Sequence, residues 1–202
     1  MNSMPTLLDV GCGPAGVLIP SHYQGWTRVR LDIDPACKPD IVLDARSLHT
    51  LPARTYDAVL CGDNIEHFFR HDGMLVAKGI LHVLKADGVA EFVTPDLEGV
   101  MRAMIDRKLD LDDVLYQSPV GPIEVHDVLY GYQREIRASG HDFYAHRTGF
   151  TRKSMLNFLK AAGFGQICVG NRGEFTLVAL AFVSRATPEQ MKLFGLPENM
   201  FA

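Results

Sequence analysis

Short apolar runs alternate along the chain with longer segments of mixed polarity, and Gly, Pro or Asp separates the two kinds. A continuous apolar run of this length is typical of a strand buried on both faces, as in the parallel sheet of an α/β protein. The pattern therefore predicts an α/β fold. Its expected strands are Thr6–Val10, Thr27–Ile33, Asp40–Ala45, Tyr56–Gly62, Val89–Pro95, Gln166–Val169 and Glu174–Val183.

Helical spacing of apolar residues marks three further segments. Asp72–Leu84 is expected to form a helix with one apolar side, and so is Asp96–Arg107. A third helix begins after Thr151, a good N-cap residue, and stops at Gly163. The expected apolar sides are Leu75, Ile80, Leu81 and Leu84 in the first helix, and Met101, Met104 and Ile105 in the second.

One segment lacks any clean period. Leu109–Arg147 mixes Pro, Gly, His, Tyr and Asp, and no linker rich in Pro or Ser cuts the chain. We therefore expect a single domain over residues 1–185, with 97–147 inserted after the fifth strand, and a weakly specified tail at 186–202. The first crossover, Gly16–Gly25, is short for a helix because Pro20 interrupts it. A lid over any ligand must come from elsewhere, and the insertion is the expected source.

Composition and charge exclude several classes. The 202 residues are 47% hydrophobic and carry a formal net charge of −4, which disfavours a nucleic-acid or membrane partner held by bulk electrostatics. Cys12, Cys37, Cys61 and Cys168 form no CxxC pair, which fits a reducing compartment. No apolar run reaches the ~20 residues of a membrane span, and no signal-peptide pattern is visible. The expected location is the cytoplasm.

A glycine-rich turn and three acids suggest a ligand site. GCGPAG, which follows the first strand directly, spells G-x-G-x-x-G and lets the backbone approach a ligand closely. Asp9, Asp32 and Asp44 end the first three strands and therefore lie at one edge of the sheet. Asp32 stands near the offset of about 20 residues at which a carboxylate meets ribose hydroxyls. Asp44 can accept from an adenine amino group.

The same residues resemble the class I S-adenosylmethionine-dependent methyltransferases. LLDVGCGPAG resembles their first motif, and RLDIDP resembles the acid of their second strand. VLDARSLHTLP, YDAVLCGDNIEHFF, HVLKADGVAEFVTPD and GFTRKSMLNFLKAAGF resemble later motifs, in the family's order, from Leu7 to Phe164. The resemblance implies a Rossmann-like, doubly wound, mostly parallel seven-stranded sheet with an antiparallel last strand. It also implies the cofactor S-adenosyl-L-methionine and transfer of its methyl group to an acceptor.

The resemblance assigns roles to individual positions. Asp9, Gly11, Cys12 and Gly13 would hold the amino-acid end of the cofactor. Asp32 would hold the ribose, with Ile33 and Asp34 beside it. Asp44 and Ala45 would contact adenine, and Cys61 and Gly62 would lie alongside.

The insertion supplies the candidate catalytic residues. Methyl transfer from a sulfonium is an in-line displacement that needs an aligned acceptor and, for a hydroxyl, a general base. A histidine suits that task at neutral pH. HDVLYGYQ and GHDFYAHRTGF resemble methyltransferase type 11-like members of bacterial origin, which are associated with surface-sugar biosynthesis. The candidates are His126, Asp127, His141 and His146, and His67 beside Glu66 either braces the pocket or faces the acceptor.

Other readings remain. A small-molecule or sugar-like acceptor is the first hypothesis, whereas a non-catalytic cofactor-binding module and an NAD(P)-dependent oxidoreductase are the alternatives. Asp9 and the short first crossover disfavour the oxidoreductase, because a pyrophosphate is usually held at a helix N-terminus. HExxH and zinc-like His/Cys spacings are absent, so no metal is expected. The pattern indicates no oligomeric state.

Overall fold

One seven-stranded sheet organises the molecule. The computed structural model describes residues 4–197, and the strands follow the order β3-β2-β1-β4-β5-β9-β8. β1 to β5 are parallel, whereas β9 is antiparallel to both β5 and β8. The predicted sheet with an antiparallel last strand is therefore confirmed. Its strands are β1 (Thr6–Val10), β2 (Thr27–Asp32), β3 (Ile41–Val42), β4 (Tyr56–Gly62), β5 (Leu84–Pro95), β8 (Gln166–Asn171) and β9 (Thr176–Phe182).

Strand β3 is shorter than the prediction. Only Ile41 and Val42 are paired, because Asp44 already serves as the N-cap of a 3-10 helix over Ala45–Thr50. The Asp44 carboxylate accepts a hydrogen bond from the Arg46 backbone N–H at 2.9 Å. A short polar side chain thus ends the strand and begins the next element.

Both faces of the sheet are buried, so successive residues of one strand serve different cores. Leu8 and Val10 of β1 belong to the larger apolar cluster, while Leu7, directly before Leu8, belongs to a second cluster on the opposite face. This arrangement explains why the strand sequences are continuous apolar runs rather than alternating ones.

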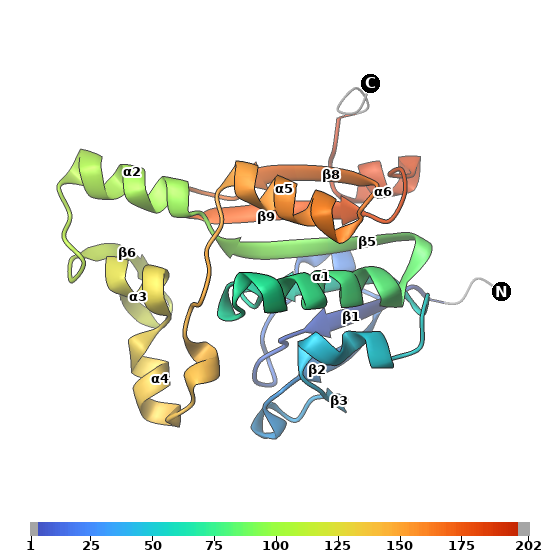
Figure 1. Ribbon diagram of the computed structural model, residues 1–202, viewed down its shortest axis with the longest axis horizontal. Helices are drawn as coiled ribbons and strands as arrows, with labels where there is room; N and C mark the ends of the chain where they lie inside the picture. The colour runs from blue at the N-terminus through green and yellow to red at the C-terminus, as the bar shows by residue number, and fades with distance from the viewer. Residues whose placement is uncertain (1–3, 198–202) are drawn as a thin grey trace.

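Helices α1 (Arg70–Val83) and α5 (Arg152–Ala162) cover the face of the larger cluster, side by side in front of the sheet (Figure 1). The predicted ends of α5 are confirmed: Thr151 caps its N-terminus, and Gly163 adopts a left-handed conformation at its C-terminus. The predicted apolar side of α1 is wrong at Leu75, which is 52% exposed. The helix instead buries Gly73, Val76, Ala77, Gly79, Ile80 and Val83.

The opposite face is covered by smaller elements. The first crossover contains only a 3-10 helix, Ser21–Tyr23, and no α-helix. The tail adds helix α6 (Pro188–Leu193), after which Phe194 packs its ring against the rings of Tyr23 and Phe182. Residues 198–202 of the predicted tail lie outside the described residues. The described part of the tail is therefore a component of the second core.

The insertion has a core of its own. It comprises α2 (Leu97–Arg107), the hairpin of β6 (Val114–Ser118) and β7 (Gly121–Glu124), α3 (Val125–Tyr130) and α4 (Gln133–Ser139), which form the left-hand part of Figure 1. Val100 and Ala103 of α2 pack in this core. The predicted apolar side of α2 is wrong at Met101 and Ile105, which are 52% and 77% exposed, whereas Met104 packs against this core.

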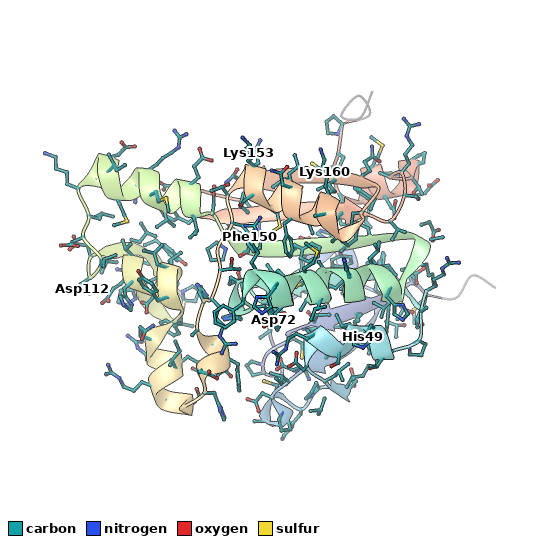
Figure 2. All side chains as sticks on the ribbon, in the orientation of Figure 1. His49, Asp72, Asp112, Phe150, Lys153 and Lys160 are labelled. Atoms are coloured by element: carbon teal, nitrogen blue, oxygen red, sulfur yellow. The ribbon has the colours of Figure 1, made fainter. Side chains whose placement is uncertain are left out.

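The two ends of the insertion meet. The Leu97 backbone N–H donates to the Phe150 carbonyl at 3.0 Å, and Asp96 pairs with Phe150 in an isolated β-bridge. Phe150, labelled in Figure 2, packs against Phe158 of α5 with ring centroids 5.2 Å apart. The chain therefore leaves and re-enters the sheet domain at one point. Its return leg, residues 140–149, passes over the carboxyl ends of the parallel strands.

Candidate functional site

A cavity of about 500 Å³ lies at the carboxyl ends of β1, β2 and β4. Open α/β sheets bind ligands at this edge, where the strand order reverses between β1 and β4. The volume lies within the usual range for a small-molecule site. The sheet domain contributes Gly11, Cys12, Gly13, Pro14, Val17, Leu31, Asp32, Ile33, Cys37, Leu43, Asp44, Ala45, Arg46, Gly62, Asp63, Asn64, His67 and Phe68; the insertion contributes Asp142, Phe143, Tyr144 and Arg147.

The glycine turn after β1 forms one wall. Gly11 has a φ of 71°, and its backbone N–H donates to the Leu31 carbonyl at 2.9 Å. A Cβ atom at Gly11 would lie 2.2 Å from the Asn64 side-chain nitrogen, so any larger residue would collide with the turn after β4. The position thus requires glycine for its backbone conformation and for space.

Asp32 connects the glycine turn to the end of β2. Its carboxylate accepts hydrogen bonds at 2.9 Å from the backbone N–H groups of Gly13 and Asp34, one at each oxygen. Each carboxylate oxygen can accept a second bond. Because Asp32 also lines the cavity, it can receive two further donors, as a vicinal diol would supply.

Asp9 lies deeper than its predicted role implies. It is buried, does not line the cavity, and accepts a hydrogen bond from the Arg28 Nε at 2.9 Å. Burial raises the pKa of the Asp9 carboxyl, while the hydrogen bond from Arg28 opposes that rise. This ion pair joins β1 to β2 directly beneath the glycine turn.

The other predicted cofactor residues occupy two zones. Gly62, Ile33 and Ala45 line the cavity, and so does Asp44, whose pKa is lowered by its hydrogen bonds with Arg46. Asp34 lies outside the cavity wall and caps the 3-10 helix Pro35–Cys37.

Two of the predicted residues are thiols, and both remain protonated at neutral pH. Cys12 lines the cavity, and burial raises its pKa to about 11. Cys61 is fully buried behind the wall, where desolvation raises its pKa well above the ordinary value. Neither is suited to act as a nucleophile, because the thiolate is the reactive form.

The four predicted catalytic residues do not come together. The His126 ring contacts the Tyr130 ring on α3 in a tilted arrangement, and the Asp127 carboxylate accepts from the backbone N–H groups of Glu124 and Gln133. His141 is exposed and stacks on Phe143. Among the described residues, those lining the cavity include none of the four predicted catalytic residues His126, Asp127, His141 and His146.

His146 meets the Glu-His pair after β4. Its ring centroid is 4.9 Å from that of His67, which lines the cavity. Burial lowers the pKa of His67 to about 4, with His146 adding to the shift, and burial also lowers the pKa of His146. Both imidazoles are therefore neutral at pH 7.

Several cavity residues were missed by sequence reasoning. Asp63, Asn64, Phe143, Tyr144 and Arg147 were not given a role at the cofactor site, although they line the cavity. Asn64 follows β4 within the segment that carries the family resemblance, so that signal was present. No local pattern indicates which residues of the insertion's return leg reach the cavity.

The model of the family described as "Methyltransferase domain" matches residues 2–169. The chain belongs to this methyltransferase family. The predicted family is therefore confirmed, and its matched region contains the whole cavity wall.

Solved structures show the same fold at low sequence identity. The PH0226 protein of Pyrococcus horikoshii is 16% identical with a TM-score of 0.58, and the match covers 89% of this chain and 82% of the PH0226 chain. A SAM-dependent methyltransferase of Archaeoglobus fulgidus is 14% identical with a TM-score of 0.56, covering 89% and 86%. The 1,6-didemethyltoxoflavin-N1-methyltransferase of Burkholderia thailandensis is 16% identical with a TM-score of 0.55, covering 90% and 72%, and its structure holds S-adenosylhomocysteine. No curated protein matches the sequence significantly.

The described residues include no helix of the length and apolarity that a membrane span requires.

Proposed function

We propose that this methyltransferase-family protein binds S-adenosyl-L-methionine in the cavity and transfers its methyl group to a small-molecule, sugar-like acceptor. The observation that carries the proposal is that the sheet domain and the insertion line opposite parts of one cavity. The sheet domain supplies a glycine turn and Asp32, and the insertion supplies Tyr144 and Arg147 to the same cavity. The residues of the sheet domain suit a nucleoside, and the polar residues of the insertion suit the acceptor.

The wall of the sheet domain fits this cofactor. Gly11 and Gly13 present backbone without side chains, and Asp32 retains acceptor capacity for ribose hydroxyls. Ile33 and Ala45 offer apolar contact to an adenine ring. The first crossover has no α-helix among the described residues, so the pyrophosphate of NAD(P) would lack its usual helix N-terminus. This disfavours the oxidoreductase alternative.

Bound in the cavity, S-adenosyl-L-methionine supplies an electrophilic methyl group on a sulfonium. The chain's own contribution is to orient the cofactor and to enclose it in the cavity. Asp32 holds the ribose and the glycine turn holds the amino-acid end, while Phe143 and Tyr144 of the return leg cover the cavity and exclude water. Arg147 donates to the Asp142 carboxylate at 3.0 Å and lies on the side of the cavity that the insertion forms, the acceptor side. There it can donate to oxygen atoms of a sugar.

A product assay tests this function. Purified protein is incubated with methyl-labelled S-adenosylmethionine and pools of sugars and other hydroxylated small molecules, and label in the acceptor is counted together with S-adenosylhomocysteine. Asp32→Asn is expected to lower turnover at subsaturating cofactor at least tenfold, whereas Asp112→Asn is not. Asp112 is exposed on the insertion, far to the left in Figure 2, and is outside the cavity wall. If the protein binds the cofactor tightly but transfers label to no member of any pool, the proposed methyl transfer to acceptors of this class is contradicted.

A further inference from the structure

Glu66, His67 and His146 converge behind the acceptor side of the cavity. Each offers one ligand atom, and these atoms all lie within 4.8 Å of one another. Atoms bound to one ion at about 2.1 Å would lie about 3.4 Å apart in a tetrahedral site. The three atoms would therefore have to approach one another by at most about 1.4 Å to reach coordinating distance.

Backbone hydrogen bonds fix the elements that carry these side chains. The Arg147 and Thr148 backbone N–H groups donate to the Glu66 carbonyl at 2.8 and 3.1 Å. The His146 backbone N–H donates to the Tyr130 carbonyl at 3.1 Å. The return leg of the insertion is thus attached to the Glu66–His67 turn, and the three ligand groups are held together by the fold.

Each member presents a lone pair that lacks a donor. Glu66 is 1% exposed, and its Oε2 has no hydrogen-bond partner among the described residues. His146 Nδ1 lies 2.9 Å from the Val128 carbonyl, so Nδ1 carries the hydrogen and Nε2 keeps its lone pair.

His67 has the same property for a different reason. Its Nδ1 lies 3.2 Å from the Ala145 carbonyl and its Nε2 lies 3.1 Å from the Asp63 carbonyl. A neutral imidazole has one N–H, so it can donate to only one of these two oxygens. The other ring nitrogen then faces a carbonyl oxygen with its lone pair, an unfavourable contact that a rotation of the ring toward a cation would relieve.

We propose that Glu66, His67 and His146 bind one divalent transition-metal ion at the edge of the cavity. Two imidazole nitrogens and one carboxylate suit Zn²⁺, Mn²⁺, Fe²⁺ or Co²⁺, whereas Mg²⁺ and Ca²⁺ prefer oxygen ligands. The Val128 carbonyl orients the His146 ring as an outer-shell acceptor, in the manner common for metal-bound histidine. Bound to the ionised Glu66 carboxylate and to the two neutral imidazoles, the ion would satisfy three lone pairs that face one another.

The position gives the ion access to the cavity. His67 belongs both to the cluster and to the cavity wall, so an open coordination position would face the acceptor side. A metal ion there lowers the pKa of a bound hydroxyl or water. The sequence analysis predicted no metal, because His146 is far along the chain from the Glu66–His67 pair and no standard spacing relates them.

Cobalt binding tests the inference without cofactor or acceptor, so its result is independent of the proposed function. Tag-free protein, stripped with chelator, is titrated with Co²⁺ while visible d–d absorption is recorded, and Zn²⁺ is then added as a competitor. Wild-type protein is expected to bind one equivalent, with a band that Zn²⁺ abolishes. Glu66→Gln and His146→Gln are each expected to weaken binding at least tenfold and to alter the band.

The matched control is His126→Gln, because His126 lies on α3 outside the cluster. This variant is expected to bind Co²⁺ as wild type does. Circular dichroism melting of each variant without metal shows that it is folded, and the two ligand variants provide separate tests should one fail to fold. Absence of saturable binding by wild type, or binding that neither Glu66→Gln nor His146→Gln weakens, overturns the inference.

Discussion

At the scale of single residues, the cofactor wall depends on a few positions whose chemistry is local. Gly11, Gly13 and Asp32 were predicted from sequence because a glycine turn and a strand-end acid are recognisable within a few residues. The collision that a side chain at Gly11 would make with Asn64 was not predictable. It depends on the packing of β1 beside β4.

Gly11→Ala tests this packing. The substitution places a Cβ where φ is 71° and where Asn64 already stands. We expect the free energy of unfolding to fall by about 1–3 kcal/mol and S-adenosylhomocysteine binding to weaken at least tenfold, measured by denaturant titration and calorimetry. Gly170→Ala is the control, because no atom lies within 4 Å of its added Cβ. Wild-type affinity in Gly11→Ala would be incompatible with the proposed wall.

The Cys12 thiol provides a pH-dependent probe of the cavity. Burial raises its pKa from 9.0 to about 11, so only the minor thiolate fraction, about one part in a thousand, reacts at pH 8. Iodoacetamide labelling of Cys12, followed by mass spectrometry of its peptide, is expected to accelerate about tenfold per pH unit up to pH 10. Bound S-adenosylhomocysteine should slow it. The urea-unfolded chain is the control, in which labelling should level off near pH 9; a plateau at pH 8 in folded protein would contradict the assigned burial.

At the scale of elements, the prediction was correct for strands with clear boundaries. It failed for the buried side of a helix and for a helix too short to show a period. The strands β1 and β4 were predicted to the residue, because their apolar runs are bounded by clear stops. The apolar side of α1 was wrong at Leu75, since the helix turns Val76 and Ile80 toward the sheet. The six residues of α6 are too few to show a period, so this helix was missed.

Phe194→Ala tests whether the tail is part of the second core. The Phe194 ring lies edge-on to His22 and Tyr23, with centroids 5.0 and 6.2 Å away. Because this ring is only partly buried, we expect the free energy of unfolding to fall by about 2 kcal/mol, less than for a fully buried Phe. Leu75→Ala, on the exposed side of α1, should change it by less than about 0.5 kcal/mol. Equal effects in urea titrations of the two variants would refute this account of the tail.

At the scale of the whole molecule, the sheet domain and the insertion differ in how far the sequence predicts them. The sheet follows from the sequence, because each strand and turn carries its own signal, and the family resemblance extends over the same region. The acceptor side does not follow, because it forms only when the return leg of the insertion crosses the strand ends. Arg147 and His146 reach their places through tertiary contacts with the Glu66–His67 turn. For this reason the predicted histidine candidates were scattered, whereas the predicted glycine turn and two of the three strand-end acids, Asp32 and Asp44, line one cavity.

The most direct test of the central claim is calorimetric titration with S-adenosylmethionine and S-adenosylhomocysteine, using wild type, Asp32→Asn and Asp112→Asn, with NAD as the competing ligand. We predict one site per chain for both sulfur compounds, unchanged in Asp112→Asn and weakened at least tenfold in Asp32→Asn, because the variant replaces an oxygen that accepts a ribose hydroxyl with a donor. NAD should produce no saturable heat. Saturable NAD binding, or binding of the sulfur compounds that Asp32→Asn leaves intact, would contradict the account.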